Sequence, residues 1–227
     1  MYVSRWSNVR GVLRAETESF LDALDGSFDE VAARPTRLPA WTVGDLVAHV
    51  WRELDRLREA LAAQPAATID VDAVSYWRAY DPATRGPEIA VRAIETAARL
   101  SDREALAGDL RRVLDEGLAG ARVVPDDRRV VTWGPGMRLD EFLATRVLEV
   151  AIHGLDLADA LARDPWLTPG AASITRGILT RLLGVEPPAI QRMSDVSFFE
   201  LASGRRRPGR AERLALGSIA SRFPLLG

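Results

Sequence analysis

Apolar residues recur every three to four positions over most of the chain, a spacing that predicts long amphipathic helices. The first predicted helix covers about 7–33 and ends at "RPTRLPA", whose two prolines cannot continue it. The second begins at Thr42, whose hydroxyl can cap the helix while Asp45 reaches back in a capping-box arrangement. A third helix is predicted over about 87–118, with a possible break near Ser101.

The fourth predicted helix, from about 139 to 162, is apolar around most of its circumference, which is typical of a central helix. Before it, clustered valines around a Pro-Asp-Asp turn predict a short hairpin or an extended connection. The fifth helix has Thr168 as its N-cap, Pro169 at its first position and Gly184 as its stop.

Beyond the fifth helix the pattern is shorter and less regular. We interpret "DVSFFELASG" as one strand and the arginine-rich "RRRPGR" after it as a loop. The expected fold is therefore mainly α. We expect an antiparallel helical bundle over residues 1–165 and a small irregular α/β extension over 166–227, made of a helix, a short strand and a loop.

Composition narrows the function classes. Hydrophobic residues make up 47% of the 227 residues, so the chain can bury a core. The formal net charge of −2 gives no footprint for nucleic acid or for an anionic membrane surface. The absence of cysteine excludes disulfides, thiolate ligands and a cysteine nucleophile. Neither a signal-peptide core nor a run of 18 apolar residues is present, so we expect a cytoplasmic protein.

The candidate chemistry lies with the two histidines of the chain. Glu149 and His153 are four residues apart on the fourth helix and project side by side. His49 lies on the flank of the apolar stripe of the second helix. If both helices face one gap, two imidazoles and one carboxylate meet there, a common zinc set with a fourth position open to water or substrate. Asp156, one turn beyond His153, is a candidate to orient a ligand or hold substrate.

The same residues have simpler interpretations. A glutamate and a histidine four apart on a helix usually form an exposed pair. A single histidine at the flank of an apolar stripe usually marks the boundary of a core. The scarcity of histidine favours the site, because both copies fall where one bundle can bring them together.

Two segments resemble a known family. "LPAWTVGDLVAHVWRE" and "RVLEVAIHGLDLADAL" resemble the mycothiol-dependent maleylpyruvate isomerase family of the DinB-like superfamily of metal-binding four-helix bundles. The family pattern has a Trp-Thr-Val segment before a helix with one histidine, and later Glu-x-x-x-His with an aspartate three residues on. The matching positions here are Trp41, Thr42, Val43, His49, Glu149, His153 and Asp156. The resemblance covers roughly residues 5–165, and the C-terminal stretch also looks like tails of actinobacterial members.

The resemblance implies an up-down four-helix bundle that carries a metal site within residues 1–165. It implies His49, Glu149 and His153 as ligands of zinc or another divalent metal, with mycothiol or a similar thiol as co-substrate. It further implies S-transfer to an electrophilic small molecule, or thiol-assisted isomerisation of it. An arginine of the C-terminal part contributes to catalysis in the isomerase, and Arg205 is our candidate among 205–207.

Arg52 and Arg146, on the two ligand helices, are alternatives for clamping a substrate carboxylate or holding the cofactor. Each also fits an ordinary arginine on a helix flank. We expect a monomer or homodimer with no nucleic-acid or membrane partner.

Two other functions stay open. The chain can be a non-catalytic metal-binding bundle in a stress response or an interaction, or a metal-assisted hydrolase with water as nucleophile. A thiol enzyme needs an open cleft with polar or cationic groups beside the metal. A binding protein has a closed site or an exposed apolar patch elsewhere.

Overall fold

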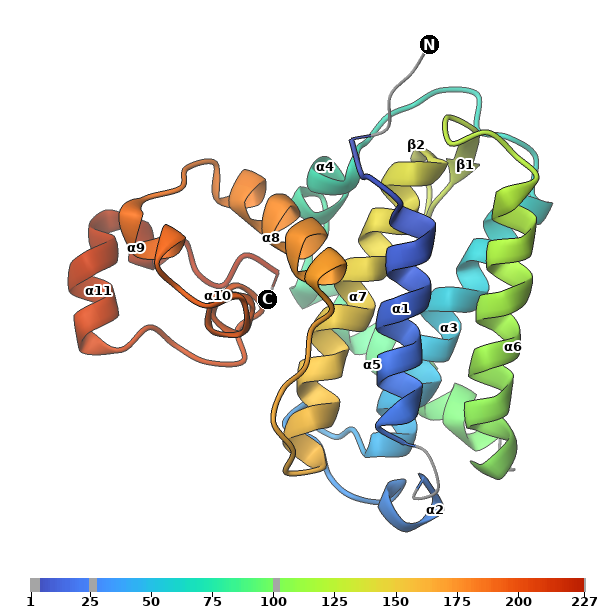
Figure 1. The fold of residues 1–227 in the computed structure, drawn as a ribbon, viewed down its shortest axis with the longest axis horizontal. Coiled ribbons are helices and arrows are strands. Elements are labelled where there is room, and N and C mark those ends of the chain that lie inside the picture. Colours follow the sequence, from blue (N-terminus) through green and yellow to red (C-terminus); the bar gives the residue numbers. More distant parts are fainter. Residues whose placement is uncertain (1–4, 25–27, 100–102, 227) are drawn as a thin grey trace.

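The computed structural model describes residues 5–24, 28–99 and 103–226 (Figure 1). Four long helices stand side by side and form a bundle, in which α1 and α3 each pack against both α6 and α7. The helices are α1 (Val9–Asp22), α3 (Val43–Ala62), α6 (Arg103–Arg122) and α7 (Leu139–Ala160). The predicted mainly α bundle is confirmed.

The chain directions in this bundle are set by the connection between α3 and α6. That connection contains α4 (Ala73–Arg78) and α5 (Pro82–Arg99). It returns the chain to the end where α3 began, so α3 and α6 run in the same direction, with Leu57 beside Gly117 and Leu61 beside Gly120. The bundle is therefore not strictly up-down as expected, because the connection through α4 and α5 reverses the chain once more. The helix α7 runs opposite to α3. Antiparallel packing places the first half of α3 against the second half of α7, where the site lies.

Two of the predicted helix boundaries are formed by the caps that the sequence suggested. The Thr42 hydroxyl accepts a hydrogen bond from the backbone N–H of Asp45, and the Asp45 carboxylate accepts one from the Thr42 N–H, so α3 has a complete capping box. The hydroxyl of Thr168 caps α8 (Pro169–Leu183), and Gly184 ends it with φ of 76°, a conformation that favours glycine.

Two predicted helices are each divided. The first is α1 followed by the single turn α2 (Phe28–Val31). The third is α5 and α6, and the break expected at Ser101 lies outside the described residues. The predicted hairpin exists as β1 (Arg129–Val131) and β2 (Gly136–Arg138), which pair antiparallel.

The hairpin turns at 132–135 and not at the Pro-Asp-Asp segment, which precedes β1. Thr132 closes the turn, because its N–H donates to the Pro135 carbonyl at 3.1 Å.

The C-terminal residues form a helical extension. After α8 it contains α9 (Pro188–Gln191), α10 (Asp195–Ala202) and α11 (Arg210–Leu216), followed by the 3-10 helix η1 (Gly217–Arg222). Figure 1 shows α9, α10 and α11 to one side of the bundle, and α10 contacts both α8 and α7. The arginine-rich loop is confirmed, since residues 205–209 connect α10 and α11 without regular structure.

The strand predicted at "DVSFFELASG" is wrong, and the described part of 166–226 is helix and loop. Ser194 caps a helix there by accepting a hydrogen bond from the Ser197 N–H. Phe198, Phe199 and Leu201 are fully buried. A short run that is apolar on all sides fits a buried strand and a buried helix equally well, and here the cap decides between them.

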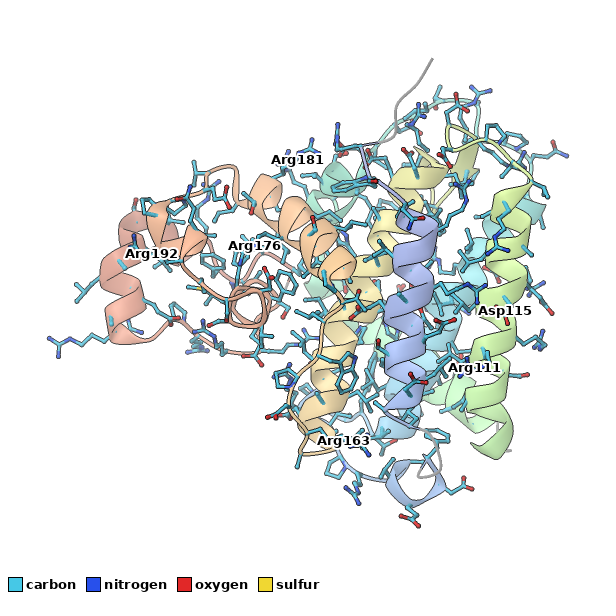
Figure 2. All side chains as sticks on the ribbon, in the orientation of Figure 1. Arg111, Asp115, Arg163, Arg176, Arg181 and Arg192 are labelled. Carbon is cyan, nitrogen blue, oxygen red and sulfur yellow. The ribbon has the colours of Figure 1, made fainter. Side chains whose placement is uncertain are left out.

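Charged residues lie mostly on the outside of the bundle. Arg111 and Asp115 of α6 are exposed, and Asp115 pairs with Arg14 of α1 at 2.7 Å (Figure 2). Arg181 and Arg192 lie at the surface of the C-terminal helices. The central helix α7 differs, because its buried residues include ionisable ones. Among the described helices, none is both long enough and apolar enough to cross a membrane.

Candidate metal centre

The structure brings together the three side chains that the sequence suggested as ligands. Glu149 Oε2 lies 3.7 Å from His49 Nε2 and 3.4 Å from His153 Nε2. One potential ligand atom from each of the three lies within 4.8 Å of the others. The two histidines are 5% and 7% exposed, so the cluster lies inside the protein rather than on a solvated helix face.

Helix packing explains why these residues meet. The apolar stripe of α3 is buried against the bundle, and it carries His49 inward with it. The helix α7 is buried almost throughout, so its Glu–His pair faces protein. The indole of Trp41, just before α3, covers both imidazoles, with its ring centre 5.0 Å from that of His49 and 6.1 Å from that of His153.

Asp156 fixes the orientation of one imidazole. His153 Nδ1 donates to Asp156 Oδ2 at 3.0 Å, because an ionised carboxylate can only accept. The other ring nitrogen, Nε2, faces Glu149 and is the atom that the neutral imidazole can offer to a metal. A carboxylate behind a histidine in this way is the usual support of a metal-binding imidazole.

Two arginines hold Asp156 in turn. Arg205 binds both carboxylate oxygens, at 3.0 Å from Nε and 2.8 Å from Nη2. Arg37 donates from Nε to the same carboxylate at 2.8 Å and from Nη1 to Glu200 at 2.6 Å. The loop before α3 and the loop after α10 therefore meet at one buried carboxylate.

Sequence reasoning missed Arg37. It lies in the proline-bounded loop "RPTRLPA", 119 residues before Asp156, and no spacing relates the two. The only local signal is a cation in a short rigid connection next to a candidate ligand helix.

Both carboxylates of the centre are ionised. Burial by itself raises the pKa of Glu149, but hydrogen bonds with His153 and His49 outweigh it and hold that pKa well below its usual range. Burial likewise raises the pKa of Asp156, and its contacts with His153 and Arg205 outweigh it, so the net pKa is lowered.

The two histidines shift in opposite directions. Burial lowers the pKa of His49 more than Glu149 raises it, so His49 is held neutral, as a metal ligand must be. Burial also acts to lower the pKa of His153, but Asp156 and Glu149 outweigh it, and the net pKa is raised.

The depressed carboxylate pKa values predict an acid-labile metal-free protein. Each carboxylate has a folded-state pKa below its unfolded value, which is about 3.9 for Asp and 4.3 for Glu, and therefore stabilises the fold above that value. This stabilisation is lost as the pH falls from the unfolded pKa toward the folded-state pKa. The free energy of unfolding should therefore drop between about pH 5 and pH 2. Asp156→Asn should flatten that drop in urea titrations, and an unchanged slope would show that Asp156 is not the source.

A cavity of about 540 Å³ adjoins the centre and is bordered by all three candidate ligands. Arg205 forms part of its wall, and most of the other lining residues are apolar. A narrower cavity of about 30 Å³ borders His49 and Glu149 as well, and Arg52 contributes to its wall. The centre is thus accessible to a small molecule and is not a closed structural site.

The remaining predicted arginines lie in different surroundings. Arg146 is fully buried, forms an ion pair with Glu53 and lies 5.0 Å above the Phe142 ring. It lines neither of these two cavities. Arg206 binds Glu212 within the C-terminal extension, and Arg207 is exposed.

Comparison with known proteins places the bundle in a family. Residues 13–158 match the sequence profile of the mycothiol maleylpyruvate isomerase N-terminal domain. The chain belongs to this family. The matched residues include His49, Glu149, His153 and Asp156, whereas Arg205 lies beyond them.

Two relatives are uncharacterized proteins of Mycobacterium tuberculosis, one from strain CDC 1551 / Oshkosh and one from strain H37Rv. Each is 33% identical over 163 residues, which are 66% of this chain and 54% of the relative. The match thus spans about half the length of these relatives. No solved structure matches the chain.

Proposed function

We propose that this protein is an enzyme that uses a divalent metal, zinc in the first instance, and a low-molecular-weight thiol such as mycothiol. The reaction is S-transfer to an electrophilic small molecule or its thiol-assisted isomerisation. One observation carries the proposal: two imidazoles and a carboxylate converge at the wall of a 540 Å³ cavity. Membership of the mycothiol maleylpyruvate isomerase family supports the choice of thiol.

The donor set fits a zinc ion. Two nitrogens and one carboxylate oxygen are a frequent catalytic zinc set, which keeps a fourth position for water or substrate. The protonation states also fit, because His49 is held neutral and Glu149 ionised. Asp156 supports the third ligand, His153, from behind.

The nucleophile must come from outside the chain, because the sequence contains no cysteine. A zinc ion bound at the site would favour the thiolate form of a thiol at neutral pH, where a free thiol is mostly protonated. The chain's own residues supply the rest. Trp41 and the apolar wall exclude water, Asp156 keeps the His153 ring in place, and Arg205 holds Asp156 from the cavity wall.

We further propose that the two parts of the chain, divided at about residue 165, have different roles in the site. The bundle supplies the metal ligands, and the C-terminal extension supplies Arg205 and part of the cavity wall. Since cytosolic systems keep small thiols reduced, we place this activity in the cytoplasm. The open cavity favours an enzyme over a non-catalytic metal-binding bundle.

A cobalt-substituted sample tests the thiol step directly. Saturating mycothiol should shift the visible absorption of the cobalt, because sulfur coordination changes the ligand field. The S-methyl derivative of the same thiol is the matched control, since it cannot form a thiolate. No spectral change with mycothiol contradicts thiol use and leaves the metal-binding bundle or the hydrolase, which uses water as its nucleophile.

A further inference from the structure

The residues that line the narrower cavity indicate which kind of substrate binds beside the metal centre. Three arginines line it, Arg52 and Arg56 from α3 and Arg92 from α5, and we call it the arginine recess. His49 and Glu149 also form part of its wall, as they do in the large cavity. The recess and the large cavity therefore adjoin the metal centre from two directions.

Positive charge in the recess is incompletely balanced. Half-buried Arg56 forms neither a hydrogen bond nor an ion pair with any residue that the structure describes. Arg92 has Glu88 at 3.6 Å, but that carboxylate is 65% exposed, so the pair is weak. Of the two carboxylates in the wall, Glu53 is paired with Arg146 and Glu149 belongs to the metal centre.

The size of the recess limits the anion. At about 30 Å³ it is much smaller than the large cavity of about 540 Å³. It therefore suits a small charged group such as a carboxylate better than a sugar. Guanidinium and carboxylate are also matched in geometry, because they form paired hydrogen bonds.

The large cavity, unlike the arginine recess, offers little positive charge to a ligand. Its wall is mainly apolar, with contributions from Leu38, Ile89, Ala90, Leu148, Ile152 and Leu226. Arg205 is the one arginine or lysine in its wall among the described residues, and Asp156 already binds that guanidinium through both oxygens. A second carboxylate in this cavity would be desolvated without a free cation to compensate it, whereas an apolar group gains from burial.

We infer that the electrophile is a monocarboxylate with an apolar body. Its carboxylate lies in the arginine recess, its apolar body lies in the large cavity, and its reactive carbon lies between them beside His49 and Glu149. This inference rests on the proposed function and narrows its substrate class. A small diacid is excluded as the preferred substrate.

Binding of unreactive probes tests this inference without thiol or turnover. We choose 4-phenylbutanoate, the matching alcohol 4-phenylbutan-1-ol and the diacid phenylsuccinate, titrated calorimetrically into the zinc-free and the zinc-loaded protein. In both forms, 4-phenylbutanoate should bind about tenfold more tightly than the alcohol, since a charge-assisted pair is stronger than a neutral hydrogen bond. Phenylsuccinate should bind more weakly than 4-phenylbutanoate.

Arg56→Gln should abolish most of the preference for the acid and leave the affinity for the alcohol unchanged. Arg58→Gln is the matched control on α3, because Arg58 is half exposed, pairs with Asp55 and does not line the recess. It should keep the preference.

Three results overturn the inference. They are equal affinity for acid and alcohol, tighter binding of the diacid, and a preference for the acid that needs zinc but survives Arg56→Gln. The last result would place the carboxylate on the metal. The cobalt spectrum can stay unchanged with mycothiol while the preference for the acid still depends on Arg56. That combination would overturn the proposed thiol chemistry and retain the carboxylate subsite, so the two failures are distinguishable.

Discussion

Replacing His49 by alanine should lower zinc affinity by more than about a hundredfold, because residues that only support a ligand already contribute 10–100-fold. His49 is one of three donors, and it comes from a different helix than Glu149 and His153. Its loss leaves two donors on α7, which cannot enclose an ion from both sides. Competition with a chromophoric chelator, and metal content after purification without chelator, measure the effect.

The companion variants show whether the loss is specific. Glu149→Gln should weaken zinc binding more than Asp156→Asn, which should cost about 10–100-fold as a residue behind the ligand. Glu59→Gln, an exposed change on α3, should leave affinity unchanged. Full zinc retention by His49→Ala removes His49 from the ligand set. A larger effect of Asp156→Asn than of Glu149→Gln exchanges their roles.

Local pattern was sufficient for the two helices that carry the centre. The capping box at Thr42 and the apolar circumference of α7 were both visible in the sequence, and so was the four-residue spacing of Glu149 and His153. What local pattern does not contain is the relative direction of the helices. The meeting of His49 with Glu149 depends on the antiparallel packing of α3 and α7, 100 residues apart in sequence. A resemblance that already included both segments supplied that link.

The contacts that sequence reasoning could not predict involve irregular segments. Arg37 and Arg205 reach Asp156 from loops, where side-chain direction follows no period. The helix α10 was misread because its apolar run has neither a two-residue nor a 3.6-residue period. Arg146 was one of two alternatives for clamping a substrate carboxylate or holding the cofactor, and the sequence does not show that it pairs with Glu53 of α3.

Arg146→Met should destabilise the metal-free protein by about 3–5 kcal/mol, the usual cost of removing one partner of a buried ion pair. Glu53 is 7% exposed and would be left as a buried carboxylate in the wall of the cavity that Glu149 also borders. For a chain of this length each kcal/mol corresponds to about 2–4 °C, so the midpoint of thermal unfolding should fall by about 6–20 °C. Urea titration measures the free energy. The matched control is Arg111→Met on the exposed face of α6, which should change stability by less than about 0.5 kcal/mol.

The double variant Arg146→Met/Glu53→Gln separates charge from packing. If the cost of Arg146→Met comes from the unpaired Glu53 carboxylate, removing that charge should recover at least half of the lost stability. If the cost comes from lost packing of the guanidinium on the Phe142 ring, the double variant should be no more stable than the single one. We expect the first outcome. Neutralised Glu53 can still accept a hydrogen bond, whereas the charged carboxylate loses the guanidinium that compensates its burial. The buried pair thus maintains the packing of α3 against α7, on which the distance from His49 to Glu149 depends.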